Sequence, residues 1–264
     1  MDAIAQPASG DAHLSRGSAI AVEGLTKRYG KLLAVDGIDF TVRQGSFMAL
    51  LGGNGAGKTT TIAMLLGLVR PTAGRIAILG EDFARNPKAL LARMNFQSPY
   101  ADLPRRLTVR QNLTVYAKLY GVRNAKGEIA QLAKDLDLDA LLDRPLGELS
   151  AGQRTRAGLA KAFINRPALV LLDEPTASLD PDTADWVRAF LARYAREAHA
   201  TFLIASHNML EVERLCDSVL MMREGRIVDR GAPRALIAKY GRTNLEDVFL
   251  DVARHGARVE GAAP

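Results

Sequence analysis

The sequence predicts an α/β fold with a mainly parallel core sheet, an antiparallel β subdomain and an inserted helical lobe. Three observations support this prediction. Continuous apolar runs, typical of strands buried on both faces, occur at Ser46–Leu51, Ala168–Leu172 and Thr201–Ala205, and helical segments separate them. Apolar and polar residues alternate from Ile20 to Val42. Helical patterns fill the stretch from about Glu81 to Leu149.

The antiparallel subdomain is predicted by a hydrophobic period of two residues. Apolar side chains recur in this way at Ile20, Val22, Ile38, Phe40 and Val42. Turns that contain glycine separate the runs, and the alternation resumes in TAGRIAILG at Ile76 and Ile78. Because successive side chains of a strand point to opposite faces, the pattern indicates strands with one buried and one solvated face.

Helices are predicted after the first buried strand and through the middle of the chain. The segment KTTTIAMLLGLVR begins at Lys58 and is stopped by Pro71. Thr108 and Gln111 have the spacing of a capping box, which predicts a helix that ends at Gly121. Two further helices are expected at Ala125–Leu142 and Thr183–His199.

The ends of the chain are expected to be polar tails. Residues 1–18 lack the apolar core of a signal peptide, and we expect flexible tails at 1–18 and 254–264. One domain is expected over 19–253, with the helical lobe at about 81–149. The longest apolar run, Ile62–Val69, is far shorter than the roughly 20 residues of a membrane-spanning helix. We therefore expect a cytoplasmic protein that reaches a membrane only through a partner.

Charge and cysteine content narrow the classes of function. The net charge of +6 and the pI near 9.6 suit phosphate groups or an anionic membrane surface. No basic cluster is dense enough for a nucleic-acid arm, so no nucleic acid is expected as a partner. Cys216 is the single cysteine, which excludes an internal disulfide, and no cysteines and histidines have metal-site spacing.

A glycine-rich loop follows the first buried strand and fits the pattern G-x-x-x-x-G-K-[ST]. The residues expected to bind phosphate are Gly52, Gly53, Asn54, Gly55, Ala56, Gly57, Lys58, Thr59 and Thr60. Glycines allow backbone N–H groups to converge on phosphates, and the next helix adds partial positive charge at its N-terminus. Lys58 supplies a full charge, and the Thr59 hydroxyl can bind Mg²⁺. The loop therefore predicts a site for a nucleoside triphosphate with Mg²⁺.

Two acidic residues follow the second buried strand, in LVLLDEP. The four aliphatic residues place Asp173 at the carboxyl edge of the sheet, where ligands of such folds bind. We expect Asp173 to hold Mg²⁺ through its water shell and Glu174 to act as the general base for the attacking water. An adjacent Asp–Glu pair is also typical of a solvated loop. The buried strand before it and the phosphate loop elsewhere favour the catalytic interpretation.

A second helix with an anion-binding start is predicted in LSAGQRTRAGLAKAF. Ser150 and Gln153 have capping-box spacing, so the N–H groups of this helix are expected to point outward. One phosphate loop does not need such a helix. At this point the chain resembles the ATP-binding cassette (ABC) family, the ATP-binding subunits of membrane transporters. In that family, the signature segment matched here by Ser150, Ala151, Gly152 and Gln153 binds the γ-phosphate held by a partner subunit.

The resemblance runs from about Ile20 to Val252 and implies roles for further residues. Tyr29 in LTKRYG matches the aromatic residue that stacks on adenine. Gln97 in MNFQSPY matches the glutamine that binds Mg²⁺ and links the metal site to the helical lobe. His207, after TFLIAS, matches the histidine that contacts the γ-phosphate.

Three residues in PTASLDP match the D-loop, which crosses the dimer interface of the family; they are Ser178, Leu179 and Asp180. Taken alone, this segment would be interpreted as a helix cap. The sequence departs from the usual family pattern at Gly53, where proline is common, and at Ala151, where glycine is usual. We expect Ala151 to be tolerated because alanine adopts a helical backbone readily.

The resemblance implies a motor driven by ATP. Two copies of the chain would enclose two ATP molecules and drive integral membrane permease subunits from the inner face of the cell membrane. The segments NLEDVFL, LTVRQNL and LYGV resemble the exporters of drugs, antibiotics, polysaccharides or lipids that have separate permeases. An importer ATPase, a soluble cassette ATPase acting on ribosomes or DNA, and a binding-only regulatory subunit are the alternatives. The single phosphate loop and the intact Glu174 argue against the last two.

Overall fold

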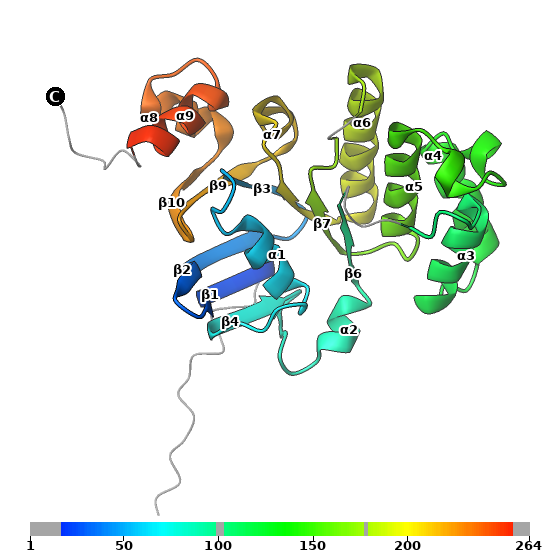
Figure 1. Ribbon diagram of the computed structural model, residues 1–264, viewed down its shortest axis with the longest axis horizontal. Helices are drawn as coiled ribbons and strands as arrows, with labels where there is room; N and C mark the ends of the chain where they lie inside the picture. The colour runs from blue at the N-terminus through cyan, green and yellow to red at the C-terminus, as the bar shows by residue number, and fades with distance from the viewer. Residues whose placement is uncertain (1–16, 99–102, 177–178, 256–264) are drawn as a thin grey trace, which may run out of the picture.

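The core of the protein is a six-stranded sheet within the residues that the computed structural model describes, which are 17–98, 103–176 and 179–255. The strands are Phe47–Gly52 (β3), Met94–Gln97 (β6), Leu169–Asp173 (β7), Thr201–Ala205 (β8), Ser218–Arg223 (β9) and Arg226–Gly231 (β10). They follow the order β10-β9-β3-β8-β7-β6 (Figure 1). All neighbours are parallel except β10, which pairs antiparallel with β9 at the edge. The predicted mainly parallel core sheet is confirmed.

The core sheet separates two hydrophobic clusters. Every residue of β3 and β8 is buried. On one face, Leu51 and Leu172 belong to a cluster that includes the helical lobe and the C-terminal helices. On the other face, Leu50 and Leu171 pack with a helix at Lys58–Leu65 (α1) and with a second sheet. Two buried faces explain why the central strands have continuous apolar runs in the sequence.

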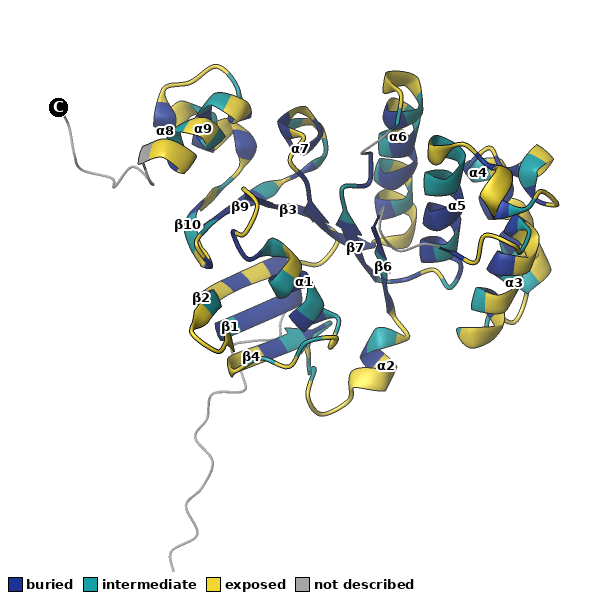
Figure 2. Cartoon of the chain, in the orientation of Figure 1, coloured by how far each residue is buried: buried dark blue, intermediate teal, exposed yellow. Residues whose placement is uncertain are grey.

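The second sheet is the predicted antiparallel subdomain. It contains Ser18–Tyr29 (β1), Leu32–Arg43 (β2), Ala73–Ile78 (β4) and Glu81–Asp82 (β5), in the order β2-β1-β4-β5. Figure 2 shows buried and exposed residues alternating along β2, as the period of two predicts. Ile62 and Leu65 of α1 are buried in the cluster that also contains side chains of both sheets. Helix α1 and its preceding loop are therefore fixed from two sides.

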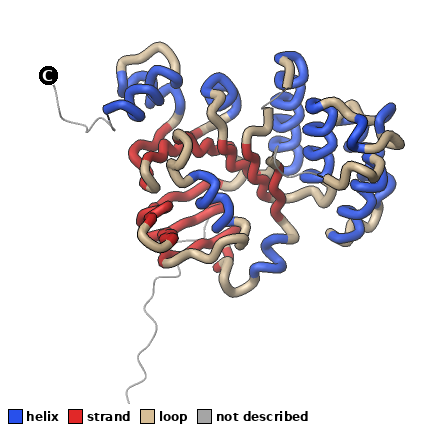
Figure 3. The backbone as a smooth tube through the Cα atoms, viewed as in Figure 1, coloured by secondary structure: helices blue, strands red, loops and turns tan. Residues whose placement is uncertain are grey.

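The helical lobe lies on one side of the core sheet (Figure 3). Its main helices are Val109–Leu119 (α3), Ala125–Asp135 (α4) and Ala151–Phe163 (α5), and the next helix, Pro181–Ala198 (α6), packs beside α5. The capping box at the start of α3 is confirmed. The Thr108 hydroxyl accepts from the Gln111 N–H at 3.1 Å, and the Gln111 side chain accepts from the Thr108 N–H at 2.9 Å.

The helices of the lobe begin later in the chain than the sequence analysis expected. Residues 81–97 form β5, a short helix at Pro87–Leu91 (α2) and β6, the edge strand of the core sheet. The strand MNFQ lacks an apolar run because Asn95 and Gln97 are polar yet buried. The Asn95 amide is satisfied there by the Ala162 carbonyl at 2.6 Å and the Asn165 side chain at 2.5 Å.

Two helices are shorter than expected. Helix α1 ends at Leu65 and does not continue to Pro71, because Gly67 adopts a left-handed φ of 68°. Helix α4 ends at Asp135, and Asp137 is left-handed with a φ of 44°. Hydrophobic spacing continued past both points and did not reveal these turns.

The C-terminal part contains Met209–Leu215 (α7), Pro233–Tyr240 (α8) and Leu245–His255 (α9). The predicted apolar stripe of α9 is buried at Leu245, Val248 and Val252. Helix α9 extends two residues into the stretch expected as a tail, and residues 1–16 and 256–264 of the expected tails lie outside the described residues. None of the helices in the described ranges combines the length and hydrophobicity that crossing a bilayer requires.

Candidate active site

The loop between β3 and α1 has a backbone that suits a phosphate. Gly57 caps α1 with a φ of 103°, and a Cβ atom there would lie 2.6 Å from the Ala34 carbonyl oxygen. Only glycine fits such a position. Gly53, Asn54 and Gly55 are exposed. No side chain in the described part of the chain caps the first N–H groups of α1, so these groups are available to an anion.

The other loop residues differ in exposure. Gly52 and Ala56 are buried at the base of the loop, and a Cβ atom on Gly52 would lie 2.6 Å from the Met222 carbonyl oxygen. Thr59 is exposed in the first turn of α1, and Thr60 is half-buried. An exposed hydroxyl at this position can bind a cation that also binds the phosphates of a nucleotide.

The Lys58 side chain folds back over the loop. Its Nζ donates to the carbonyl oxygens of Gly52 at 2.5 Å and Gly53 at 3.1 Å. Burial lowers the pKa of Lys58, whereas the nearby carboxylates of Glu174 and Asp173 raise it. The structure thus brings the predicted phosphate-binding lysine close to both predicted acidic residues.

Glu174 and His207 meet where the parallel neighbours β7 and β8 end. The His207 backbone N–H donates to Glu174 Oε1 at 3.0 Å, and His207 Nδ1 lies 2.5 Å from the same oxygen. Glu174 has a left-handed φ of 51°, and its N–H donates to the Ala205 carbonyl at 2.8 Å. Such a backbone is uncommon for a residue with a side chain. The two residues predicted to be catalytic are therefore in direct contact.

Ser98, and not Gln97, lies beside Asp173. The Ser98 hydroxyl donates to Asp173 Oδ2 at 3.3 Å. Gln97 pairs with Leu172 across the parallel strands, so its side chain lies on the sheet face opposite to that of Asp173. Burial raises the pKa of Asp173, and the Ser98 hydroxyl and Lys58 counteract this effect. The expectation that Gln97 binds Mg²⁺ together with Thr59 and Asp173 stays a prediction, and in this structure Ser98 is the residue bonded to Asp173.

Gln97 faces the helical lobe. A Cβ atom on Gly158 of α5 would lie 2.5 Å from Gln97 Nε2, which donates to the Ser98 carbonyl at 3.1 Å. Gln97 Oε1 is buried and has no hydrogen-bond partner among the described residues. Gln97 thus makes the contact with the helical lobe that the resemblance implies. The hydrogen bond to Asp173 is made by the next residue, Ser98.

The oxygen atoms near the loop are suited to Mg²⁺. They are the Asp173 carboxylate and the Thr59 and Ser98 hydroxyls, and Mg²⁺ prefers such hard donors together with substrate phosphates. The described ranges contain no group of three histidine, cysteine or acidic side chains that could hold a metal. Nucleotide phosphates would be further ligands for a cation at this site.

Tyr29 ends β1, and 46% of its surface is exposed. Lys27 Nζ lies 4.9 Å from the centre of its ring and also donates to the Arg70 carbonyl at 2.8 Å. The exposed ring is compatible with stacking on a base.

The predicted signature segment forms the exposed start of α5. The Ser150 hydroxyl accepts from the Gln153 N–H at 3.2 Å, and the Gln153 side chain accepts from the Ser150 N–H at 3.0 Å. Ala151 is the first helical residue, as expected for an alanine that tolerates this backbone. Helix α5 lies apart from α1 in Figure 1. The structure does not bring the signature segment of one chain to the phosphate loop of that chain.

The described part of the D-loop lies next to the signature segment. A Cβ atom on Gly152 would contact Leu179 at 3.5 Å. The Asp180 carboxylate caps α6 and accepts from the Thr183 N–H at 2.9 Å. The helix-cap interpretation of Asp180 is therefore correct as local structure, and Ser178 lies outside the described residues.

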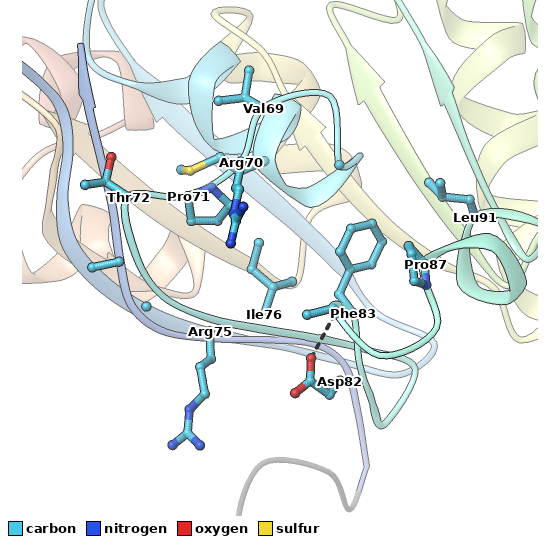
Figure 4. Close-up of a pocket in the computed structure, with 15 residues that line it drawn as sticks. Val69, Arg70, Pro71, Thr72, Arg75, Ile76, Asp82, Phe83, Pro87 and Leu91 are labelled. Atoms are coloured by element: carbon cyan, nitrogen blue, oxygen red, sulfur yellow. Dashed lines mark hydrogen bonds between the residues drawn. The ribbon is translucent and has the colours of Figure 1, made fainter. Parts of the chain in front are cut away.

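A cavity at the end of α1 is separate from this site. It has a volume of 550 Å³ and is lined by residues that include Met64, Val69, Phe83 and Leu91, at the C-terminal end of α1 (Figure 4). The phosphate loop contributes none of its lining. A smaller cavity of 250 Å³ lies between the phosphate loop and α9.

Two residues of the site were not predicted from the sequence. Ser98 was missed because only the register of β6 shows which of two successive residues faces Asp173. Glu211 is buried in α7 and bonded to Ser206, which precedes His207. A charged residue four positions after a predicted catalytic histidine was the available signal for Glu211.

Comparison with known proteins agrees with this geometry. A family model described as "ABC transporter" matches residues 35–177. Nod factor export ATP-binding protein I of Burkholderia orbicola is 41% identical over 83% of this chain and 72% of its own length. Bacitracin transport ATP-binding protein BcrA of Bacillus licheniformis is 38% identical over 88% of this chain and 75% of its own length.

Solved structures give the same result. The structure of an ATP-binding subunit of an ABC transporter has a TM-score of 0.83 and 26% identity, and the match covers 90% of this chain and all of the other. CbiO1 from Clostridium perfringens, part of the transporter complex cbiONQ, has a TM-score of 0.75 and 28% identity over 91% of this chain and 96% of its own. The chain belongs to the ABC transporter family and is one of its ATP-binding, ATP-hydrolysing subunits.

Proposed function

We propose that two copies of this chain bind ATP between them and power outward transport through a separate membrane permease. The observation that carries the proposal is the exposed, capped start of α5, which stands apart from the phosphate loop of its own chain. The name of one relative, a Nod factor export ATP-binding protein, supports the outward direction. On this account, the protein works at the inner face of the cell membrane, bound to the permease.

Each ATP site is composite. The phosphate loop of one copy binds the triphosphate, and Tyr29 stacks on the adenine. The segment from Ser150 to Gln153 of the other copy directs its helix dipole and the N–H groups that the capping box does not use at the γ-phosphate. Leu179 lies close enough to Gly152 for an added Cβ atom to contact it, and this proximity supports joint movement of the signature segment and the D-loop at the interface. Nucleotide binding would thereby close the two copies together.

Hydrolysis depends on positioning and charge. Lys58 would exchange its loop carbonyl partners for phosphate oxygens, and Thr59, Asp173 and Ser98 would hold Mg²⁺. When bound, Mg²⁺ supplies positive charge that stabilises the phosphates during transfer. Glu174 takes the proton of the attacking water, and His207 keeps its carboxylate oriented through the contact at Oε1. Gln97 transmits the state of the site to α5 through its packing on Gly158.

Replacing the general base tests this chemistry. We expect Glu174→Gln to lower kcat for ATP hydrolysis at least about 100-fold, because an amide cannot accept the proton. ATP should remain bound, and size-exclusion chromatography with light scattering should show an ATP-dependent dimer. Wild-type protein with ADP is the control and should remain monomeric. Undiminished turnover in Glu174→Gln would contradict the role of Glu174.

The direction of transport is tested with the product of the reading frame beside this chain. We expect this product to be a permease with about six membrane-spanning helices that co-purifies with the chain. In inside-out vesicles that carry both proteins, ATP should drive substrate into the vesicle lumen. Movement of substrate out of these vesicles would show import and contradict the proposal.

A further inference from the structure

A buried acidic side chain lies behind Glu174 and His207. Glu211 of α7 is only 1% exposed. Its Oε1 accepts a hydrogen bond from the Thr176 hydroxyl at 2.9 Å, and its Oε2 accepts one from the Ser206 hydroxyl at 2.9 Å. Burial of a carboxyl group is costly unless such partners satisfy it, so the bonds define the environment of Glu211.

The two hydroxyls belong to the two loops that carry the predicted catalytic residues. Thr176 lies two residues after Glu174, and Ser206 directly precedes His207. Ser206 Oγ also lies 3.4 Å from Glu174 Oε2. A single buried carboxyl group therefore connects the chain after β7 to the chain after β8.

The hydrogen bonds of Glu211 stabilise the loop that contains Glu174. Glu174 is in the left-handed region, and such a backbone persists only where surrounding contacts fix it. Its own N–H is bonded to Ala205, which precedes Ser206. Glu211 connects the same two loops a second time, through its hydrogen bonds with Thr176 and Ser206.

We propose that Glu211 is a positioning residue for ATP hydrolysis, which sets the Glu174 carboxylate against His207 through the hydroxyls of Thr176 and Ser206. It acts on the reacting groups only through these neighbours. The inference rests on the proposed roles of Glu174 and His207, and it adds the part of the fold that keeps them together.

An amide side chain at position 211 can make the same two hydrogen bonds as Glu211. Burial raises the pKa of Glu211 and the nearby Glu174 adds to this effect, whereas the two hydroxyls and Arg188 of α6 oppose it. Because a hydroxyl both donates and accepts, a glutamine can accept from Thr176 and donate to Ser206. A leucine fills similar space but makes neither bond.

The test compares Glu211→Leu with Glu211→Gln by steady-state kinetics and nucleotide binding. We expect Glu211→Leu to lower kcat about 10- to 100-fold, the effect of a displacement near 1 Å in a catalytic group. The dissociation constant for ATP, measured in the absence of turnover, should stay within about twofold because the phosphate loop is untouched. Glu211→Gln should restore kcat to within about threefold of the wild type.

Glu213→Gln is the matched control on the same helix. Its carboxylate accepts the Leu245 N–H at 2.6 Å at the start of α9, away from both loops. We expect this variant to keep the wild-type kcat. A wild-type kcat in Glu211→Leu, or an equal loss in Glu213→Gln, would overturn the proposal. If Glu211→Leu does not fold, Thr176→Val and Ser206→Ala remove the same two bonds singly and are judged by the same criterion.

Glu174→Gln, measured in parallel, distinguishes failure of the role of Glu174 from failure of the role of Glu211. Retained turnover in Glu174→Gln contradicts the proposed role of Glu174, on which the inference rests. Loss of turnover in Glu174→Gln together with a normal kcat in Glu211→Leu contradicts only the positioning role of Glu211.

Discussion

Gly57 and Gly53 stand in the same loop, but the structure constrains them differently. A Cβ atom on Gly57 would meet the Ala34 carbonyl at 2.6 Å, and its φ is 103°. A Cβ atom on Gly53 would meet nothing within 4 Å. We expect Gly57→Ala to destabilise the protein by about 1–3 kcal/mol and to weaken ATP binding at least about tenfold, because the loop must distort. Urea unfolding and calorimetric titration with ATP measure the two effects.

Gly53→Ala is the control for this prediction. It should leave stability and ATP affinity close to those of the wild type, and proline is common at this position in the family. Equal losses in the two variants would show that loop flexibility, and not the backbone geometry of Gly57, determines binding.

At the residue scale, the sequence predicted the acidic pair and the histidine because both follow buried parallel strands. Strand ends of this kind meet at one edge of a sheet, and Glu174 and His207 are in contact there. In this structure Ser98, and not Gln97, is bonded to Asp173, and the role of Gln97 in binding Mg²⁺ stays a prediction. A residue type and its spacing do not give the register of a short edge strand, and a shift of one residue reverses the face.

At the scale of the element, two helices begin with the same capping box, and only one is proposed to contact ATP. Ser150 caps α5, and Thr108 caps α3. We expect Ser150→Ala and Thr108→Ala each to lower the free energy of unfolding by about 1 kcal/mol. Only Ser150→Ala should also weaken ATP-dependent dimerisation, measured by light scattering in the Glu174→Gln background.

Comparing Ser150→Ala with Thr108→Ala distinguishes a loss of helix stability from a loss of contacts at the dimer interface. If Thr108→Ala weakens dimerisation as much as Ser150→Ala, the loss comes from helix stability. In that case the start of α5 has no direct part in the composite site.

Lys161 gives the link between α5 and β6 a pH dependence. Its Nζ donates to the Phe96 carbonyl at 2.9 Å, and burial lowers its pKa from 10.5 to about 8. Between these values the unfolded chain binds the proton and the folded chain does not, so the contribution of Lys161 to stability rises with pH. Below about pH 8 both states bind the proton, and the burial cost of the charge is fully present.

Lys161→Met removes this titration. We expect the free energy of unfolding of the wild type, relative to Lys161→Met, to rise by up to about 3 kcal/mol between pH 7 and pH 10.5. Urea unfolding of both proteins across this pH range measures the difference in free energy. The contributions of the other titrating groups are the same in both proteins and cancel. A difference that does not change with pH would show that the ammonium group is solvated in the folded protein.

Also at this scale, the sequence predicted the central strands and both capping boxes, because a few local residues specify each of them. It did not predict β6, whose buried Asn95 depends on partners in the lobe, or the early end of α1 at Gly67. Both depend on contacts or backbone angles that a hydrophobic pattern does not contain.

At the scale of the whole molecule, the phosphate loop and the signature segment lie in different parts of the fold. The phosphate loop and α1 lie between the two sheets, and the signature segment starts a helix of the lobe. On the proposed account, one chain carries two halves of different ATP sites. The central claim is that a second copy supplies the missing half.

Cross-linking between two singly substituted chains tests this claim most directly. Asn54→Cys marks the exposed phosphate loop, and Ala151→Cys marks the exposed start of α5. The native Cys216 is buried and burial raises its pKa, so it should not react. Both substitutions are made in the Glu174→Gln background, and the two proteins are mixed with a short thiol cross-linker.

With ATP and Mg²⁺, we predict a covalent dimer that contains one chain of each kind, formed much faster than with ADP or without nucleotide. The same yield of this mixed dimer with and without ATP, or no mixed dimer while ATP is bound, would contradict the composite site.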